Sequence, residues 1–507
     1  MAGKYLLSTL GCKVNQYESQ QIRELIESLG LEPAAPGEQP DIAIVNTCAV
    51  TADASRSSRR TIRRVSAAGV TPVIVVGCGA TADADRLRQI DGVTAVLGHD
   101  AHVDVELRRV LTTRLALPLA GSPGETRPTT ETAGEPRNPS GNDVWMIPGG
   151  QPRHAESPSP DSPLPIISGP LGIVKTDEAL IGRIEAFAGH QRAFLKVQDG
   201  CDAHCTYCII PQLRRTLRSK PVPVAVAEAA RLVRSGHKEI VITGIFLGAY
   251  GRPTAIRRRF SPGPSPLARL VEAVSAVEGL QRLRLSSLEP GDVDDDLLEV
   301  LATRPNCVPH LHLPLQSGSA DVLRRMNRQY TRDQFVGMID RVRAALDQPA
   351  ISTDIIVGFP GESDADFEAS VDVARYARFC KVHVFPFSPR AGTAAARWGT
   401  DFVPAGVQRA RMQRLAGIEA ECSLAYRRSL LGRTERVIVE KTPDPAPTYA
   451  GLADRYFKVW FDSREPFAPG ELVNVRLDRV TPARTHGTLL PHDGADYPLL
   501  VLSNACE

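Results

Sequence analysis

Residues 194–208 read FLKVQDGCDAHCTYC, and the rest of the chain is organised around this stretch. The apolar run 194–197 is typical of a buried strand. The polar loop after it carries Cys201, Cys205 and Cys208 in a C-x3-C-x2-C spacing. Three thiolates can hold three irons of a [4Fe–4S] cube, which leaves the fourth iron for a small molecule to chelate. The alternatives are a zinc site or incidental buried cysteines, but the spacing differs from that of zinc ribbons.

The composition is that of an ordinary globular protein. Of the 507 residues, 42% are hydrophobic and 23% are charged, and the formal net charge is only +2, so the charge of the whole chain does not indicate a nucleic-acid partner. No apolar run approaches the ~18 residues of a membrane span, and the N-terminus lacks the layout of a signal peptide. We therefore expect a cytoplasmic protein with no membrane partner, in which cysteines bind metals rather than form disulfides.

Three further cysteines follow predicted strands near the N-terminus. The strand-like runs 4–11, 41–47 and 72–77 lead directly to Cys12, Cys48 and Cys78, and helical patterns lie at 16–29 and 55–67. Strands that alternate with helices predict a parallel α/β sheet, in which ligands bind beyond the carboxyl ends of the strands. One edge of this sheet could therefore collect all three thiols as a second iron–sulfur site. The alternative is three buried cysteines, which are common inside proteins.

From residue 194 onward, strand-like runs alternate with helical ones. The predicted strands are 194–199, 239–246, 282–288, 310–316, 351–358 and 381–388, and the predicted helices lie near 222–235, 266–278, 319–347 and 363–377. Six β/α units predict a partial barrel, and barrel enzymes place their chemistry at the carboxyl ends of the strands. The candidate residues at those ends are Gly244, Ser287, Glu289, Gln316, Asp354, Gly358 and Arg390. Each could instead be an ordinary group of a barrel rim.

Two segments differ in composition from these domains. Residues 118–179 are rich in Pro, Gly and Ser, which is typical of a disordered linker. After residue 432, short strand-like runs at 434–440, 455–461, 472–478 and 497–502 predict a small all-β barrel of the OB type. On this barrel Lys441, Arg455 and Lys458 are candidate phosphate contacts. Tyr456, Phe457 and Trp460 are either platforms for bases or part of the barrel core.

The cysteine motifs carry a resemblance to a known family. The loop with Tyr207 before its third cysteine resembles the radical S-adenosylmethionine (SAM) superfamily. Within it, GCKVNQYES at 11–19, NTCAVT at 46–51 and VGC at 76–78 look like the three cysteine motifs of the methylthiotransferases. The first of these motifs resembles the branch that acts on N6-threonylcarbamoyladenosine in tRNA. The resemblance covers about residues 4–111 and 180–502.

This resemblance implies that the chain is an α/β protein, and it implies the order of its domains and the identity of its two cofactors. It implies a flavodoxin-like N-terminal domain (1–117), the linker (118–179), a partial (β/α)6 TIM-type radical SAM barrel (180–430) and a C-terminal RNA-binding TRAM domain (431–507). It also implies two [4Fe–4S] clusters, one on each group of three cysteines, with SAM on the open iron held by Cys201, Cys205 and Cys208. Around SAM, Gly244, Ser287 and Glu289 would meet its amino-acid part and Gln316 its ribose. Asp354 and Gly358 would flank its adenine, and Arg390 would meet an anion.

The activity implied is the methylthiolation of C2 of N6-threonylcarbamoyladenosine at position 37, in the anticodon stem-loop of tRNA. The resemblance implies no catalytic residue beyond the cluster ligands, and it implies an electron donor such as flavodoxin or ferredoxin. The rival enzyme is a methylthiotransferase for isopentenyladenosine in tRNA or for a ribosomal protein. A rival of another class is a non-catalytic RNA-binding or electron-transfer iron–sulfur protein, against which the predicted SAM residues at the strand ends argue.

Overall fold

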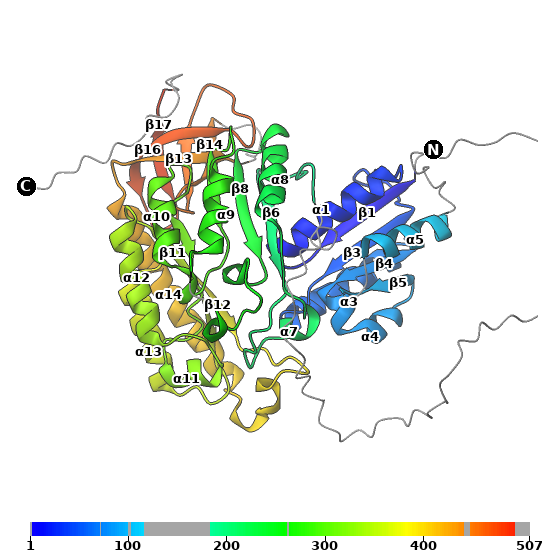
Figure 1. Ribbon diagram of the computed structural model, residues 1–507, viewed down its shortest axis with the longest axis horizontal. Helices are drawn as coiled ribbons and strands as arrows, with labels where there is room; N and C mark the ends of the chain where they lie inside the picture. Colours follow the sequence, from blue (N-terminus) through cyan, green and yellow to red (C-terminus); the bar gives the residue numbers. More distant parts are fainter. Residues whose placement is uncertain are drawn as a thin grey trace, which may run out of the picture. The chain divides into compact units, whose positions relative to one another are not determined.

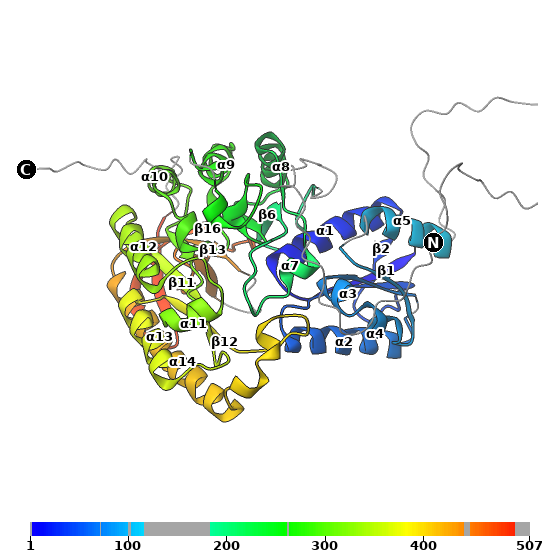
Figure 2. The same cartoon turned by 60° about the horizontal axis from the view of Figure 1, so that its bottom comes forward.

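The computed structural model describes residues 3–70, 72–99, 103–115, 183–260, 263–440 and 447–491. These residues form a parallel α/β sheet, a β/α barrel and a small β-barrel, in chain order (Figures 1 and 2). The predicted linker 118–179, Lys441 and the predicted strand 497–502 lie outside the described residues. The predicted fold class is therefore confirmed in each of its three parts.

The N-terminal sheet has the strand order β2-β1-β3-β4-β5, which is the flavodoxin-like order. The strands are β1 (Lys4–Thr9), β2 (Glu32–Pro33), β3 (Ile42–Thr47), β4 (Val73–Gly77) and β5 (Val93–Leu97), and all neighbours are parallel. On one face lie α1 (Lys13–Ser28) and α5 (Val103–Leu115), and on the other α2 (Ala52–Ala67), α3 (Cys78–Ala82) and α4 (Ala84–Arg88) (Figure 2). β3 and β4 are buried on both faces, because helices cover both sides of the sheet.

The β/α barrel consists of six parallel strands with helices outside them. The strands are β6 (Arg192–Asp199), β8 (Glu239–Gly244), β9 (Arg282–Leu285), β10 (His310–His312), β11 (Ala350–Val357) and β12 (Lys381–Pro386), with the short β7 (Arg218–Ser219) antiparallel to β6. The helices are α7 (Ile210–Leu213), α8 (Val222–Arg234), α9 (Pro266–Ser275), α10 (Asp295–Thr303), α11 (Ala320–Arg325), α12 (Arg332–Ala345), α13 (Asp364–Ala377) and α14 (Ala405–Ser429). A parallel bridge between Ser287 and His312 joins β9 to β10.

The predicted helix 319–347 was wrong as a single element, because it is divided into α11 and α12. Asn327 lies between them with a φ of 56°, a left-handed conformation that ends a helix. Thr331 then starts α12 with a capping box, in which its side chain accepts a hydrogen bond from the Gln334 amide. The break places residues 326–330 beside the cysteine loop rather than on the outside of the barrel.

The C-terminal module is a closed five-stranded barrel in the order β13-β14-β15-β17-β16. Its strands are β13 (Thr434–Val439), β14 (Thr448–Ala453), β15 (Lys458–Asp462), β16 (Leu472–Val480) and β17 (Thr485–Leu489). Only β15 and β17 pair in parallel, and the other pairs are antiparallel. The predicted strand 455–461 begins instead at Lys458, because Tyr456 adopts a φ of 64° in the preceding turn.

Three candidate RNA contacts on this module, Arg455, Tyr456 and Phe457, are engaged within the protein instead. Arg455 is buried, and its guanidinium donates to Glu435 at 2.5 Å and to the Asp347 carbonyl at 3.0 Å. Its charge is therefore neutralised where the small barrel contacts the β/α barrel. Tyr456 stacks on His310 of β10, with ring centroids 4.4 Å apart. Phe457 packs against the barrel core. Trp460 remains half-exposed beside the Arg484 guanidinium, which lies 5.3 Å from the ring centroid.

Candidate active site: two groups of three cysteines

The loop with Cys201, Cys205 and Cys208 is fixed by contacts on both sides. Gly200 has a φ of 80°, and a Cβ there would lie 2.0 Å from the Thr216 carbonyl oxygen, so no other residue fits. The Cys201 amide donates to the Arg214 carbonyl at 3.1 Å. The Asp202 carboxylate accepts hydrogen bonds from Thr254 and Ala255. The position of the first cysteine is therefore set by the chain on either side of it.

The second half of the loop rests on the connection between α11 and α12. The Thr206 amide donates to the Met326 carbonyl at 3.0 Å, and its hydroxyl donates to the Arg325 carbonyl at 2.8 Å. The Asn327 side chain donates to the His204 carbonyl at 2.7 Å. The break that sequence reasoning missed therefore holds the cysteine loop in place.

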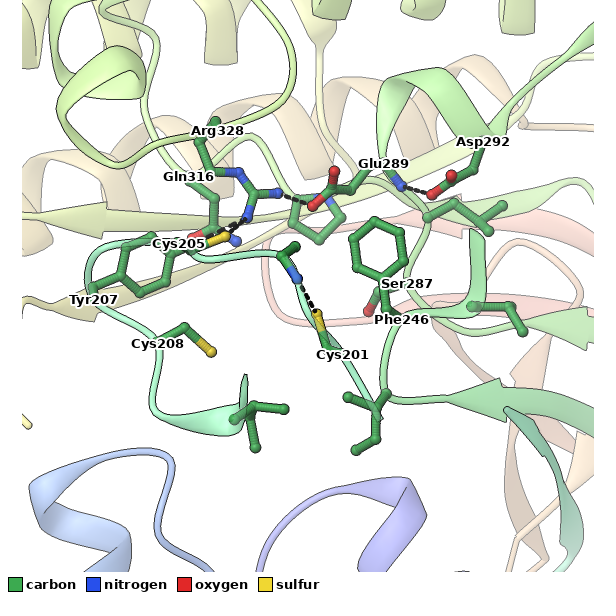
Figure 3. A pocket seen from close by; sticks show the side chains of 16 residues that line it. Cys201, Cys205, Tyr207, Cys208, Phe246, Ser287, Glu289, Asp292, Gln316 and Arg328 are labelled. Carbon is green, nitrogen blue, oxygen red and sulfur yellow. Dashed lines mark hydrogen bonds and ion pairs between the residues drawn. The ribbon is translucent and has the colours of Figure 1, made fainter. Parts of the chain in front are cut away.

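The three cysteines open into one cavity of about 170 Å³. Its other lining residues are Ala203, Tyr207, Ile210, Ile245, Phe246, Leu247, Ser287, Leu288, Glu289, Asp292, Pro314, Gln316 and Arg328. Figure 3 shows the three sulfur atoms turned toward the same space. Burial raises the pKa of Cys208 to about 12 and that of Cys205 above its usual value. Three thiols that ionise poorly alone fit a metal group, because iron stabilises the thiolate form.

An arginine that sequence reasoning missed connects the cysteine loop to the barrel. The Arg328 guanidinium donates to the Cys205 sulfur at 3.2 Å, to the Tyr207 hydroxyl at 3.2 Å, and to the Glu289 carboxylate. The second oxygen of Glu289 pairs with Arg257 at 3.2 Å, and Arg257 also pairs with Asp292 at 2.5 Å. Both oxygens of Glu289 are thus already engaged by guanidinium groups. Arg328 is buried, and its contacts depend on the helix break, so no local motif reveals its role.

The cavity brings together only some of the predicted SAM residues. Ser287, Glu289 and Gln316 line it, and Gln316 has a φ of 62°, a strained conformation typical of functional positions. Gly244 lies behind the lining, where a Cβ would come within 2.9 Å of the Gln198 side chain. The Gly358 amide donates to Glu362 at 2.5 Å, away from the cavity lining. Asp354 pairs instead with His312, at 3.2 Å.

The other three cysteines meet at one edge of the N-terminal sheet, as the strand order requires. They follow β1, β3 and β4, which are neighbours, so the strand ends lie side by side. Gly11 lies against Cys48, since a Cβ on Gly11 would be 3.1 Å from the Cys48 sulfur. Burial raises the pKa of Cys78 to about 11 and also raises that of Cys48, to which the negative charge of Cys12 adds. This donor set also fits a cluster, and Cys12 is the exposed member.

Arg390 does not line the cavity at Cys201, Cys205 and Cys208, and it lies instead near the N-terminal domain. Burial lowers the pKa of Arg390, while the negative charges of Asp83 and Cys48 in the N-terminal domain act in the opposite direction. The neighbouring Ser388 accepts a hydrogen bond from the Ala52 amide at 3.0 Å. The end of β12 therefore contacts the loop after Cys48. The anion expected near Arg390 would then lie at the N-terminal sheet.

The two groups of cysteines lie on either side of a short apolar wall. Ile209, Ile210 and Leu213, which follow Cys208 directly, pack in one cluster with Ala49 and Cys78 of the N-terminal sheet. Ile210 also packs against Cys201 and Ala203. The negative charge of Cys78 also contributes to the raised pKa of Cys208, after burial and the charge of Cys205. A molecule at this wall could therefore meet both groups.

Family models match both halves of this arrangement. A model of the Radical SAM superfamily matches residues 195–374, and one described as Uncharacterized protein family UPF0004 matches residues 4–98. A solved structure of the radical S-adenosylmethionine methyltransferase TsrM from Kitasatospora setae, with cobalamin and a [4Fe-4S] cluster bound, has a TM-score of 0.50. It is 14% identical and the match covers 78% of this chain and 74% of that one, so it supports the fold alone.

Curated relatives extend the match to nearly the whole chain. Threonylcarbamoyladenosine tRNA methylthiotransferase MtaB of Chlamydia pneumoniae is 33% identical over 480 residues, which cover 94% of this chain and 96% of the relative. A tRNA-2-methylthio-N(6)-dimethylallyladenosine synthase of Frankia alni is 33% identical over 515 residues, which cover 99% and 90%. Fold and site define a radical SAM enzyme. The chain belongs to the radical SAM tRNA methylthiotransferase family, whose cofactors are SAM and [4Fe–4S] clusters.

None of the helices in the described parts of the chain is both long and apolar enough to cross a membrane.

Replacing Arg328 with Met should lower reductive cleavage of SAM about 10- to 100-fold, the value of one charged hydrogen bond at a buried site. The change leaves Glu289 with one guanidinium partner and removes the donor to the Cys205 sulfur. The measurement is 5′-deoxyadenosine formed per iron, so that cluster loss is separated from slow turnover. Arg324→Met is the matched control, because Arg324 is exposed on α11 and forms an exposed ion pair with Asp321. Equal rates in the two variants would contradict the role of Arg328.

Proposed function

We propose that this protein methylthiolates C2 of N6-threonylcarbamoyladenosine at position 37 of tRNA. Its sequence is as similar to relatives named for that nucleoside as to relatives named for the dimethylallyl nucleoside, so identity alone does not choose between them. The GCKVNQYES wording around Cys12 supports the first. The observation that carries the activity itself is the packing of the two cysteine groups against one wall, centred on Ile210.

In this proposal each group of cysteines holds one cluster. Cys201, Cys205 and Cys208 would hold the cluster that binds SAM, and Cys12, Cys48 and Cys78 the second one. When bound, these cofactors supply the one-electron chemistry and the sulfur and methyl groups. An aromatic C–H bond such as that at C2 is too weak an acid for any side-chain base, so acid–base catalysis cannot replace them.

In this proposal the chain's own residues shape the cavity at the first cysteine group and keep water away from the reacting carbon. Arg328 and Arg257 share Glu289 between them and so fix the wall of the cavity that faces Cys205. Ser287 and Gln316, which follow the neighbouring strands β9 and β10, offer hydrogen-bonding groups to the same cavity. Ile209, Ile210 and Leu213 form an apolar surface between the cysteine groups, which excludes water from the place where a reactive carbon must lie.

The remaining predictions about partners belong to this proposal. On the C-terminal barrel Trp460, Arg484 and His486 lie together, and they suit a stacked base and a phosphate. Lys458 pairs with Glu440 at 2.7 Å on an exposed surface. Recognition of the anticodon stem-loop, a flavodoxin or ferredoxin as electron donor, and a cytoplasmic location all stay predictions.

The test is turnover of defined RNA by the reconstituted enzyme. Anticodon stem-loops with threonylcarbamoyladenosine, isopentenyladenosine or adenosine at position 37 are incubated with SAM and dithionite, and the nucleosides are separated by mass spectrometry. We expect the 2-methylthio product from the first RNA, at a rate at least about tenfold above the others, because one buried polar group in the wrong environment costs that much. A product only from the isopentenyl RNA would establish the rival enzyme. SAM cleavage without any RNA product would overturn both.

A further inference from the structure

A histidine lies at the same edge of the N-terminal sheet as the three cysteines. In this sheet β5 is the neighbour of β4, and Val76 of β4 is paired with Leu97 of β5 (Figure 1). Cys78 and His99 follow these paired residues by two positions each, so both leave the carboxyl edge of the sheet side by side. The Nε2 atom of His99 lies 3.5 Å from the Cys78 sulfur, which is a hydrogen-bonding contact. The edge that collects the cysteines therefore also carries an imidazole.

The backbone of His99 is held by the short helix that begins at Cys78. The His99 amide donates to the Thr81 hydroxyl at 2.9 Å, and Thr81 lies on α3. Gly98 packs against the same threonine, since a Cβ on Gly98 would lie 3.0 Å from the Thr81 hydroxyl oxygen. Because α3 supplies both the thiol and the anchor of the histidine, one element holds the imidazole and the sulfur beside each other.

Two roles are open to an imidazole at this distance from a cysteine sulfur. It could be a further ligand of a bound metal, or it could donate a hydrogen bond to the ligand sulfur. In a [4Fe–4S] cube each iron is bound by three sulfides and has room for one protein ligand, so His99 cannot share an iron with Cys78. The other irons lie at other corners of the cube, and their ligands point away from Cys78. His99 is therefore placed to donate to a cube's ligand rather than to be one.

A single zinc ion is the other occupant that this donor set allows. Three cysteines and one histidine are a set that structural zinc sites use, and zinc–ligand distances of about 2.0–2.3 Å bring the ligand atoms within about 4 Å of one another. Among the described residues, only the ligand atoms of His312, Asp354 and His383 form a group of three or more that all lie within 4.8 Å of one another. The three N-terminal cysteines and His99 are therefore spaced more widely, which favours a larger group such as a cube.

We propose that His99 donates a hydrogen bond to the Cys78 sulfur and thereby raises the reduction potential of the cluster at Cys12, Cys48 and Cys78. This inference rests on the proposed function, which assigns a cluster to those cysteines. A thiolate bound to iron can only accept a hydrogen bond, so Nε2 of His99 must carry the hydrogen. The hydrogen bond stabilises negative charge on the sulfur. Reduction adds one more negative charge, so the reduced cluster gains more from the hydrogen bond than the oxidised cluster does.

The other cysteine group has a donor of the same kind. The Arg328 guanidinium donates to the Cys205 sulfur at 3.2 Å, and a charged donor makes the stronger hydrogen bond. Each group thus has a donor to one ligand sulfur, and His99 and Arg328 belong to different domains. The potential of the second cluster, at the N-terminal cysteines, can therefore be changed through His99 without touching the first cluster, at the cysteine loop of the barrel.

The experiment is a redox titration of the full-length, cluster-loaded enzyme, followed by electron paramagnetic resonance, with dithionite as the one-electron donor. The signal of the first cluster is the one that added SAM changes. We expect His99→Phe to make reduction of the second cluster about 3- to 10-fold less favourable, which is a fall of about 30–60 mV for one electron, because part of the strength of one charged hydrogen bond is lost. His99→Gln, whose amide can still donate, should recover most of the potential. The iron content should stay at about eight in each protein.

The controls separate this hydrogen bond from a general effect on the fold. His190→Phe is the matched variant, because His190 is an exposed histidine that packs on Phe187, with ring centroids 4.9 Å apart. It should leave both potentials unchanged, and His99→Phe should leave that of the first cluster unchanged. An unchanged potential of the second cluster in His99→Phe, at full iron content, would overturn the inference while the proposed function stands.

A measurement on the wild-type enzyme decides the case even if the variants lose iron. Histidine is labelled with ¹⁵N, and the hyperfine couplings of the reduced second cluster are recorded in H₂O and in D₂O. A hydrogen-bonded imidazole gives a weak nitrogen coupling and a proton that exchanges with D₂O. A strong nitrogen coupling would identify His99 as a ligand, and no coupling at all would exclude the hydrogen bond, so either result would overturn the inference. Wild type with only one cluster, or with zinc at the N-terminal cysteines, would instead overturn the cluster assignment of the proposed function.

Discussion

Replacing Cys12, Cys48 and Cys78 together with alanine is expected to leave reductive cleavage of SAM intact and to abolish the methylthiolated nucleoside. The reason is a division of labour between the two cysteine groups. The cavity at Cys201, Cys205 and Cys208 is formed by the β/α barrel and its cysteine loop, and none of the three N-terminal cysteines lines it. Iron content should fall from about eight to about four per chain, because one of two cubes is lost. Iron, 5′-deoxyadenosine and product nucleoside are measured on the same samples.

The reciprocal variant gives the opposite pattern. Alanine at Cys201, Cys205 and Cys208 should remove SAM cleavage and product together, again with about half the iron. Cys307→Ala is the control, because Cys307 is buried in the barrel core and contacts neither group. A first variant that no longer cleaves SAM, yet keeps its fold and four irons, would show that the two sites depend on each other. The assignment of separate clusters would then be wrong.

Replacing Glu18 with Gln is expected to destabilise the protein by about 3–5 kcal/mol, the usual cost of removing one partner from a buried ion network. Glu18 of α1 pairs with Arg214 at 2.7 Å and Lys196 at 2.9 Å, and Asp199 pairs with the same two cations. Without the Glu18 charge, two buried cations share one carboxylate. The measurement is the midpoint of urea unfolding of the cluster-loaded protein under anaerobic conditions. An unchanged midpoint would contradict the prediction.

The same ion network makes the free energy of unfolding decrease as the pH is lowered. Burial alone would raise the pKa values of Glu18 and Asp199, but Arg214 and Lys196 outweigh it and hold both well below their usual range. A carboxyl group with a depressed pKa contributes stability at every pH above its ordinary value, and loses it as the pH falls through the native value. Wild type should therefore lose stability below about pH 4, and Glu18→Gln should lose less of it there. Glu32→Gln, in an exposed pair with Lys4, is the control and should leave unfolding unchanged.

The sequence predicted that three cysteines meet at one edge of the N-terminal sheet, because the rule behind this prediction is topological. Parallel strands end at one edge, so cysteines that follow β1, β3 and β4 meet whatever lies between them in the chain. Arg328 and Arg257 could not be predicted in this way. Their roles depend on where α11 stops and on which acid lies opposite, and neither fact is contained in a local pattern.

Charged residues on strands were the second source of error. Arg455 was a candidate phosphate contact on the C-terminal barrel, but its guanidinium donates to Glu435 and to the Asp347 carbonyl where the two barrels meet. Arg282 and Arg284 are similarly buried, and they donate to carbonyl groups of residues 452–454. A periodic pattern of charge and apolar residues identifies two faces of a strand. It does not tell whether the polar face meets water or another domain.

Arg214 sets a condition for anyone who wishes to recombine these domains. Its carbonyl group holds the first cysteine of the radical SAM loop, and its guanidinium grips Glu18 of the N-terminal helix. A chimera that joins this N-terminal domain to a foreign barrel would therefore leave the buried Glu18 carboxylate without its arginine partner. The cysteine loop of the foreign barrel would also lack the contacts that hold it in its own protein. Transplanting residues 196–214 with the domain would carry the whole connection across. The segment to exchange is thus the cysteine loop together with Arg214 and its partner Glu18. The domain boundary predicted from sequence separates these two residues.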